Sequence, residues 1–240
     1  AKKYLEKSAE QKNGKAIYIL AKIYYKEKNR ERIKEYQKQL LERSQLYGVT
    51  KDMKKNIEYM LGNKNDNKYF DLVEKANEYI DKEEYKKAEE ILLEASKLNK
   101  EGYYQIAEMY RYISIEEAMK KYEIAYEKGV AKAANNIGSY YYIKKDMENA
   151  KIWIQKAIDG GDVDSNFYMG ELYDNAGELK KSYEYYSIAA NNKNAIAMFS
   201  AGEIAFELGE EKLGKYWYNR ILTEKGIEQL SEKLIIALEN

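Results

Sequence analysis

The sequence of 240 residues contains no cysteine, no proline and no histidine. Without cysteine there are no disulfides, and without both cysteine and histidine the usual ligands of structural zinc and haem are missing. The commonest pairs of a nucleophile and a base are missing as well. Carboxylate chemistry remains open, but we interpret the acidic residues as spread over polar helix faces. We therefore expect no cofactor, no metal site and no catalytic residue, and predict that the chain is not an enzyme.

Long apolar runs and a net charge are also absent. No stretch reaches the roughly 18 apolar residues of a membrane-spanning helix, so we expect no membrane partner. Lys and Arg number 41, as do Asp and Glu, so the net charge is zero and gives no overall attraction to nucleic acid. Residues 1–68 nevertheless hold 18 basic against 9 acidic residues, a net +9, which leaves −9 for residues 69–240. We expect a chain that is basic at its beginning and acidic towards its end.

Small residues recur in the sequence at a fixed spacing. Intervals of 31, 31, 32 and 32 residues separate Ala76, Ala107, Gly138, Gly170 and Gly202. A second series follows 11 or 12 residues later and consists of Ala88, Ala118, Ala150, Ser182 and Gly214. A third follows after another seven residues and consists of Ala95, Ala125, Ala157, Ala189 and Ile221. A period of this length is typical of stacked repeats, which usually bind partners rather than transform substrates.

Residues 131–162 are the clearest repeat unit. One apolar face has the i, i+3, i+4, i+7 spacing of a helix and consists of Ala134, Ile137, Gly138 and Tyr141. A second helical face follows, with Ala150, Ile154 and Ala157. Asp146 is the predicted N-cap of this second helix, and Gly160-Gly161 are predicted to end it. Each unit is therefore predicted to be a helix pair that approaches closely at Gly138, where leucine should overpack the contact.

These motifs resemble the tetratricopeptide pattern, aromatic-x₂-Leu-Gly-x₂-Tyr followed by Ala-x₃-Phe-x₂-Ala. The pattern is met by Ala134, Ile137, Gly138, Tyr141, Ala150, Ile154 and Ala157. The next unit matches with Asn166, Met169, Gly170, Tyr173, Ser182, Tyr186 and Ala189, and the previous one with Tyr103, Ile106, Ala107, Tyr110, Ala118, Tyr122 and Ala125. The segment from Trp153 to Ala157 is similar to the related Sel1-like repeats, although the usual proline is absent and the inter-helix loops are short.

The resemblance implies an all-α fold. We expect a right-handed α-solenoid of about six stacked antiparallel helix pairs, forming a single domain over residues 1–240. A helix over Ile227–Leu238 is predicted to cap the stack at its C-terminal end. Residues 1–8 align with residues 150–157, so we expect the chain to open inside the second helix of a unit, as a fragment of a longer protein.

The segment of about residues 41–68 interrupts the repeat, because Ala21 and Ala76 are 55 residues apart. Thr50–Leu61 has a candidate N-cap and helical apolar spacing, which predicts an extra helix. Gly62–Asn67 is predicted to be a loop. The segment is either a degenerate repeat or a kink that reshapes the binding groove.

In the family that the sequence resembles, the first helices of the pairs line a concave groove. The groove positions, carried over unit by unit, include Tyr18, Lys22, Tyr25, Tyr104, Glu108, Arg111, Lys132, Asn135, Ser139, Tyr142, Ile143, Phe167, Glu171, Asp174, Phe199, Glu203 and Phe206. Asn135 is of special interest, because an amide can pair with a peptide backbone of any sequence. The alternative is that the aromatic residues belong to the core, as expected for Tyr110, Tyr141 and Tyr173, and that the charges form an ordinary solvated face.

The leading functional hypothesis is a non-catalytic scaffold that binds a peptide or a partner helix in this groove. The alternative is an accessory module of a larger enzyme or secreted factor, whose chemistry lies outside this fragment. The basic first 68 residues permit RNA binding, but the acidic remainder would repel phosphate, so we do not expect a nucleic-acid partner. Self-association through terminal helices is a further hypothesis, with Tyr4 and Leu5 exposed. The lack of thiols suits the cytosol, which we slightly favour, or a periplasmic or secreted location.

Overall fold

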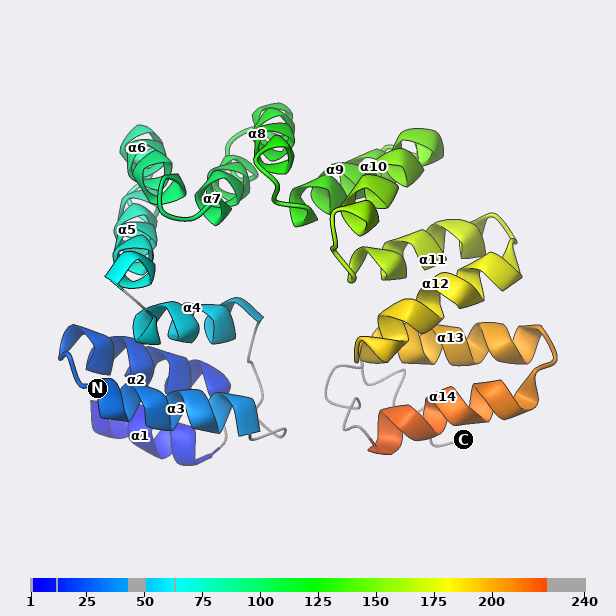
Figure 1. Cartoon of the computed structure of the whole chain (residues 1–240), viewed down its shortest axis with the longest axis horizontal. Coiled ribbons are helices and arrows are strands. Elements are labelled where there is room, and N and C mark those ends of the chain that lie inside the picture. Colours follow the sequence, from blue (N-terminus) through cyan, green and yellow to red (C-terminus); the bar gives the residue numbers. More distant parts are fainter. Residues whose placement is uncertain (1, 12, 43–50, 63, 224–240) are drawn as a thin grey trace. The chain divides into compact units, whose positions relative to one another are not determined.

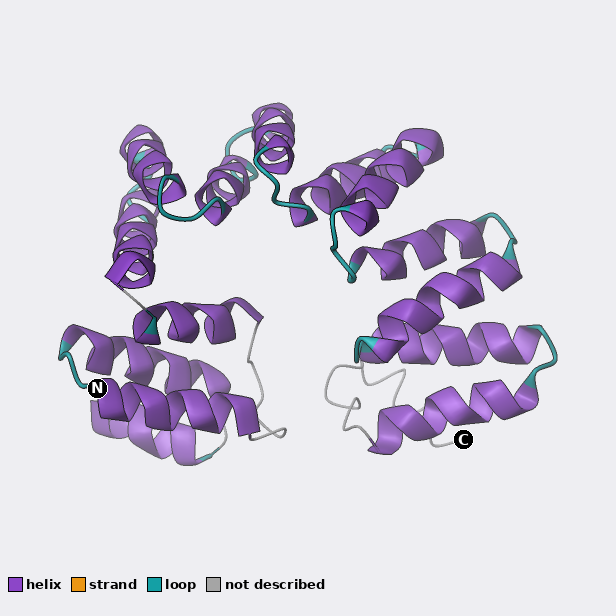
Figure 2. Ribbon diagram, in the orientation of Figure 1, coloured by secondary structure: helices purple, strands orange, loops and turns teal. Residues whose placement is uncertain are grey.

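The structure is a computed structural model, and it describes residues 2–11, 13–42, 51–62 and 64–223. Within these ranges the chain forms fourteen α-helices joined mostly by short loops (Figures 1 and 2). None of these helices combines the length and the apolar character that crossing a membrane requires. The chain divides into two compact units, Ala1–Gly102 and Tyr103–Asn240, and each has its own helix packing.

The first unit contains two helix pairs and two further helices. Its helices are α1 (Lys2–Glu10), α2 (Gly14–Lys26), α3 (Arg30–Glu42), α4 (Lys51–Leu61), α5 (Lys64–Ile80) and α6 (Tyr85–Ser96). Helix α2 packs against α3, α5 packs against α6, and α4 contacts both α3 and α5. Their shared core includes Leu20, Ile33 and Ile57. Leu5 packs against this core, contrary to the expectation that it is exposed, whereas Tyr4 is 84% exposed.

Helix α4 confirms the extra helix that the apolar spacing predicted, although the predicted cap Thr50 lies outside the described residues. The loop predicted at Gly62–Asn67 is wrong from Lys64 onwards, because α5 already begins there. The reason is a contact between helices: Asn67 Nδ2 donates to the carbonyls of Tyr59 at 2.6 Å and Met60 at 3.0 Å. A polar run that resembled a loop therefore opens a helix and caps the C-terminal end of α4.

The second unit contains four helix pairs, of which the first helix begins two residues before the unit boundary (Figure 1). Its helices are α7 (Glu101–Tyr110), α8 (Ile115–Glu127), α9 (Lys132–Ile143), α10 (Met147–Asp159), α11 (Ser165–Asn175), α12 (Leu179–Asn191), α13 (Ala195–Glu207) and α14 (Glu211–Thr223). We call the odd-numbered member of each pair its A helix and the even-numbered member its B helix. Over the described residues of both units the chain thus forms six pairs, as predicted. The predicted capping helix Ile227–Leu238 lies outside them.

The three series of small residues mark the helix crossings. Every member of the three series is buried. A Cβ atom on Gly138 would lie 2.6 Å from Ile154 Cγ1, and one on Gly170 would lie 2.6 Å from Tyr186 Cδ1. Both distances are far inside van der Waals contact, so the backbone of each A helix rests directly on its B helix. The repeat period in the sequence is therefore the period of these close contacts.

The turns of the second unit follow the predicted caps. Asp146 accepts a hydrogen bond from the backbone N of Asn149 at 3.1 Å, which confirms it as the N-cap of α10. Gly161, which follows α10, has a φ of +91°, a left-handed conformation that glycine adopts without strain. Lys145 and Lys193 take the same conformation after α9 and α12, with φ of 60° and 63°.

The three tyrosines expected in the core do pack there. Tyr110 and Tyr141 are partly buried against the cluster around Ala107, Ala118 and Tyr122. Tyr173 stacks on Tyr185, with ring centroids 5.4 Å apart and planes 11° from parallel. These side chains hold A and B helices together.

Candidate functional site

The predicted groove residues of the first unit contact the segment that interrupts the repeat. The Tyr18 hydroxyl accepts a hydrogen bond from Asn56 Nδ2 of α4 at 3.0 Å. Lys22 forms an ion pair with Glu74 of α5. The Tyr25 hydroxyl donates to the carbonyl of Asn67 at 3.3 Å. Each of the three α2 side chains thus has a partner within its own unit.

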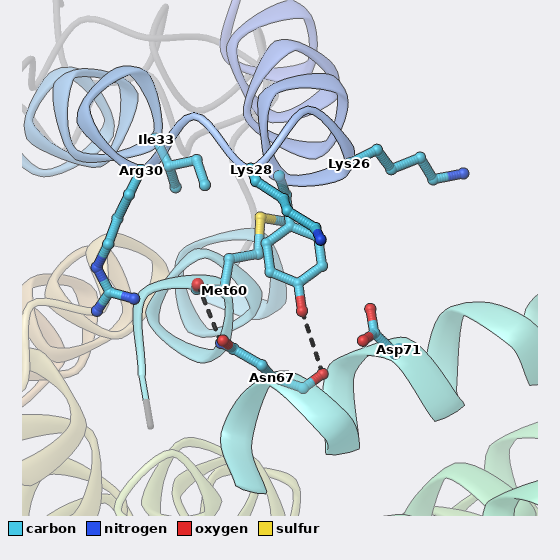
Figure 3. Close-up of a pocket in the computed structure, with 8 residues that line it drawn as sticks. Lys26, Lys28, Arg30, Ile33, Met60, Asn67 and Asp71 are labelled. Carbon is cyan, nitrogen blue, oxygen red and sulfur yellow. Dashed lines mark hydrogen bonds between the residues drawn. The ribbon is translucent and has the colours of Figure 1, made fainter. Parts of the chain in front are cut away.

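A cavity of about 510 Å³ lies beside these contacts (Figure 3). Its lining consists of Tyr25, Lys26, Lys28, Arg30, Ile33, Met60, Asn67 and Asp71. Arg30 donates to the carbonyl of Leu61, so Arg30 and Asn67 together bind the last carbonyls of α4. Burial, with the neighbouring carboxylate of Asp71, raises the pKa of Tyr25 to about 12. In Figure 3 Lys26 points away from the other labelled side chains. We therefore assign the polar groups of this cavity mainly to holding α4 in place.

In the second unit, Glu108 is the centre of a polar network that joins α7, α8 and α9. It accepts hydrogen bonds from the hydroxyl of Tyr122, from Arg111 Nη1 at 2.9 Å and from Asn136 Nδ2 at 2.9 Å. Asn136 Nδ2 also donates to the hydroxyl of Tyr104 at 3.1 Å. Burial, and then the hydrogen bond to Glu108, raises the pKa of Tyr122, so its hydroxyl stays a neutral donor. The sequence predicted three of these five residues but missed Tyr122 and Asn136, whose roles depend on which neighbour each faces.

Two hollows lie side by side across α9. The first hollow, about 210 Å³, is lined by Arg111, Ile115, Met119, Tyr122, Asn136, Ser139, Tyr140 and Ile143. The second hollow, about 190 Å³, is lined by Ser139, Tyr142, Ile143, Ile154, Tyr168 and Glu171. Both share Ser139 and Ile143, and the Ile143 side chain is 76% exposed. We call the two hollows together the α9 groove.

The structure brings several predicted residues to this groove and adds others. Arg111, Ser139, Tyr142, Ile143 and Glu171 were predicted and line it. The resemblance missed Tyr140 and Tyr168, because the family pattern supplies only one set of positions per A helix. No signal in the sequence separated these two tyrosines from the tyrosines of the core.

Two acceptors at or next to the second hollow lack hydrogen-bond donors among the described residues: the Glu171 carboxylate in its lining and Asn135 Oδ1 behind Tyr168. Asn135 Oδ1 is buried and has no hydrogen-bond partner among the residues that the structure describes. Burial and the carboxylate of Glu171 raise the pKa of Tyr168, whereas a hydrogen bond from the Asn135 amide to the Tyr168 side chain lowers that pKa. Burial, and then the charge of Asp174, raises the pKa of Glu171.

The other predicted residues pack within or between repeats. The Lys132 ammonium lies 3.9 Å from the centroid of the Tyr104 ring. Phe167 contacts Tyr186, with ring centroids 5.6 Å apart. A separate cluster surrounds Tyr218: Phe199 stacks on it, Phe206 meets it edge-on and Glu203 accepts from its hydroxyl. Within the described part of the chain, no group of three or more acidic side chains is placed to hold a metal ion.

No family model matches the sequence. A Sel1-like repeat-containing protein of Acanthamoeba polyphaga mimivirus is 31% identical over 106 residues, which are 43% of this chain and 19% of that protein. The chain therefore spans about a fifth of the length of the curated relative that it matches. PilF of Pseudomonas aeruginosa is 14% identical, with a TM-score of 0.50 over 67% of this chain and 78% of that one, which shows a shared fold. The crystal structure of MamA is 20% identical, with a TM-score of 0.48 over 64% of this chain and 96% of that one.

Proposed function

We propose that this chain, a helical-repeat protein of the tetratricopeptide and Sel1-like family, is a scaffold that binds a segment of a partner protein in the α9 groove. The proposal gives the chain a binding role and no reaction of its own. The observation that carries it is the pair of adjoining hollows across α9, lined by predicted groove residues from α9 and α11 and by Arg111, which directly follows α7. An extended segment laid across Ile143 would place one side chain in each hollow.

The chemistry of the groove suits a peptide. The hollows combine apolar and aromatic walls with a few polar groups, which is the usual make-up of a binding site. Ser139 and Glu171 supply polar groups in the lining of the second hollow, and a peptide N–H can donate to either of them. Burying one large apolar side chain contributes about 1.5–3 kcal/mol, so two anchors and a few hydrogen bonds suit an affinity in the micromolar range, about −8 kcal/mol.

The test is a selection of random linear peptides displayed on phage against the intact protein. The affinities of the selected peptides are then measured by calorimetry. The double substitution Asn135→Ala with Tyr142→Ala should weaken the binding at least tenfold, because Tyr142 is one wall of the second hollow and Asn135 is hydrogen-bonded to Tyr168, which is another wall. Circular dichroism should show unchanged helicity.

The matched control exchanges the same residue types at exposed positions of the first unit, Tyr4→Ala with Asn77→Ala. This variant should bind the selected peptides with the affinity of the wild type. Equal weakening by both double variants, or full-strength binding by the groove variant, would remove the α9 groove from the site.

A further inference from the structure

We propose that the second hollow, between α9, α10 and α11, binds a lysine or arginine side chain of the partner segment. The inference rests on the proposed function and adds the chemistry of one anchor to it. Three kinds of observation support it: the shape and walls of the hollow, the unpaired carboxylate in its lining, and a comparison with equivalent positions in the other repeats.

The walls of the hollow suit a long cationic side chain. They consist mainly of Tyr142, Ile143, Ile154 and Tyr168, with the carboxylate of Glu171 as the charged member. Lysine and arginine have an apolar stem, which packs on such walls, and a charged end that seeks a polar partner. Tyrosine rings also attract cations at their faces. A purely apolar side chain would fill the same volume but would leave the carboxylate without a counter-ion.

The carboxylate in the hollow has no donor among the residues that the structure describes. No hydrogen bond or ion pair joins the Glu171 side chain to any part of the chain that the structure describes, and Asp174 one turn later adds a second negative charge. Their mutual effect is visible in the raised pKa of Glu171, which burial and Asp174 cause. A cation in the hollow would reverse both effects, because it replaces lost hydration and offsets the like charge.

The repeats themselves provide an internal comparison. Glu108, Glu171 and Glu203 occupy the same position, directly after Ala107, Gly170 and Gly202 of the first small-residue series. Glu108 accepts from three donors, including Arg111, and Glu203 accepts from the hydroxyl of Tyr218. Glu171 lacks a donor from the described residues although it occupies the same place. In two repeats this glutamate accepts hydrogen bonds from the protein itself. In the repeat that borders the groove it has no hydrogen-bond donor among the described residues.

Different residues at three equivalent positions explain why Glu171 lacks a hydrogen-bond donor. The residue equivalent to Arg111 is Asp174, so the internal cation is replaced by a like charge. The equivalent of Tyr122 is Tyr186, and the equivalent of Asn136 is Ser200. Ser200 lowers the pKa of Tyr186 against the dominant effect of burial, which places the two beside each other. Neither donates to Glu171. The missing cation of this repeat is the one that we assign to the partner.

The experiment uses the same random peptide library on the intact wild type and on Glu171→Gln. The wild type should select peptides that share one lysine or arginine, and Glu171→Gln should lose that preference. For a selected peptide, replacing the lysine by norleucine should weaken wild-type binding about tenfold or more, because a charged hydrogen bond is lost. The norleucine peptide should bind Glu171→Gln and the wild type alike. Glu184→Gln, an exposed carboxylate on α12, is the matched control and should keep the preference.

Selected peptides without a shared cation, or a preference that survives Glu171→Gln, would overturn this inference and leave the proposed function standing. A library that yields no peptide for the wild type would overturn both. Glu171→Lys provides a second variant: it should prefer the selected peptide with glutamate in place of its lysine, and a continued preference for lysine would contradict the inference.

Discussion

Gly138→Ala tests the close approach of α9 and α10. The added Cβ would lie 2.6 Å from Ile154 Cγ1, 3.1 Å from the backbone N of Ile154 and 3.2 Å from the carbonyl oxygen of Ala150. Two of these neighbours are backbone atoms, so a side-chain rotation cannot relieve the contact and the two helices must separate. Overpacking of this kind costs about 1–3 kcal/mol, whereas alanine gains about 1 kcal/mol over glycine in a helix.

The expected net effect of Gly138→Ala is therefore a loss of roughly 0–2 kcal/mol in the free energy of unfolding. Gly138→Leu gains less from helix propensity and adds more atoms, so it should destabilise by about 3 kcal/mol or more. The assay is urea denaturation followed by circular dichroism. Ser139→Ala, one residue along the same helix, is the control and should change the stability by less than about 1 kcal/mol.

A double-mutant cycle with Ile154→Ala identifies the contact itself. Ile154→Ala removes the Cγ1 atom that the new Cβ would meet, at a cost of about 2–5 kcal/mol on its own. In that background Gly138→Ala should destabilise less, with a coupling energy of about 1–2 kcal/mol. A stabilisation by Gly138→Ala in the wild type, equal to the full gain in helix propensity, would refute the reasoning, as would strictly additive effects in the cycle.

Three further predictions concern stability away from this crossing. Lys145→Gly should stabilise the protein by up to about 1 kcal/mol in urea denaturation, because the left-handed backbone at Lys145 strains any side chain. The reverse change Gly161→Lys should destabilise the protein. A change in stability of the same sign for both variants would contradict this. Glu171→Gln should have a growing stability advantage over the wild type as the pH rises from about 4 to 7 in thermal melts. The pKa of Glu171 is raised above its ordinary 4.5, so the folded wild type loses stability as the unfolded chain ionises first; a constant difference would argue against it. Asn135→Ala should leave the melting temperature unchanged or higher, because a buried acceptor without a donor is removed, and a marked drop would show that the hydrogen bond to Tyr168 outweighs the cost of that acceptor.

The sequence alone determined the helix pairs and where they touch. Only glycine or alanine lets two helix backbones meet, so the spacing from Gly138 to Gly170 reports the repeat directly. The N-cap at Asp146 could equally be predicted, because capping depends on residues only three positions apart in the sequence. The extra helix α4 also followed from local apolar spacing. A single domain over the whole chain stays a prediction.

Only the tertiary structure decided what the polar residues do. Asn67 was assigned to a loop, but it caps a helix that precedes it in the chain, a contact that no local pattern encodes. Tyr18, Lys22 and Tyr25 occupy predicted groove positions, yet the same unit supplies their partners. Seven of the twelve residues that line the α9 groove were not predicted as groove positions, because hollows form between helices and depend on the side chains that leave space. Glu108 and Glu171 share one position in the repeat. Residues from neighbouring helices donate hydrogen bonds to Glu108, but none of the described residues donates to the Glu171 side chain.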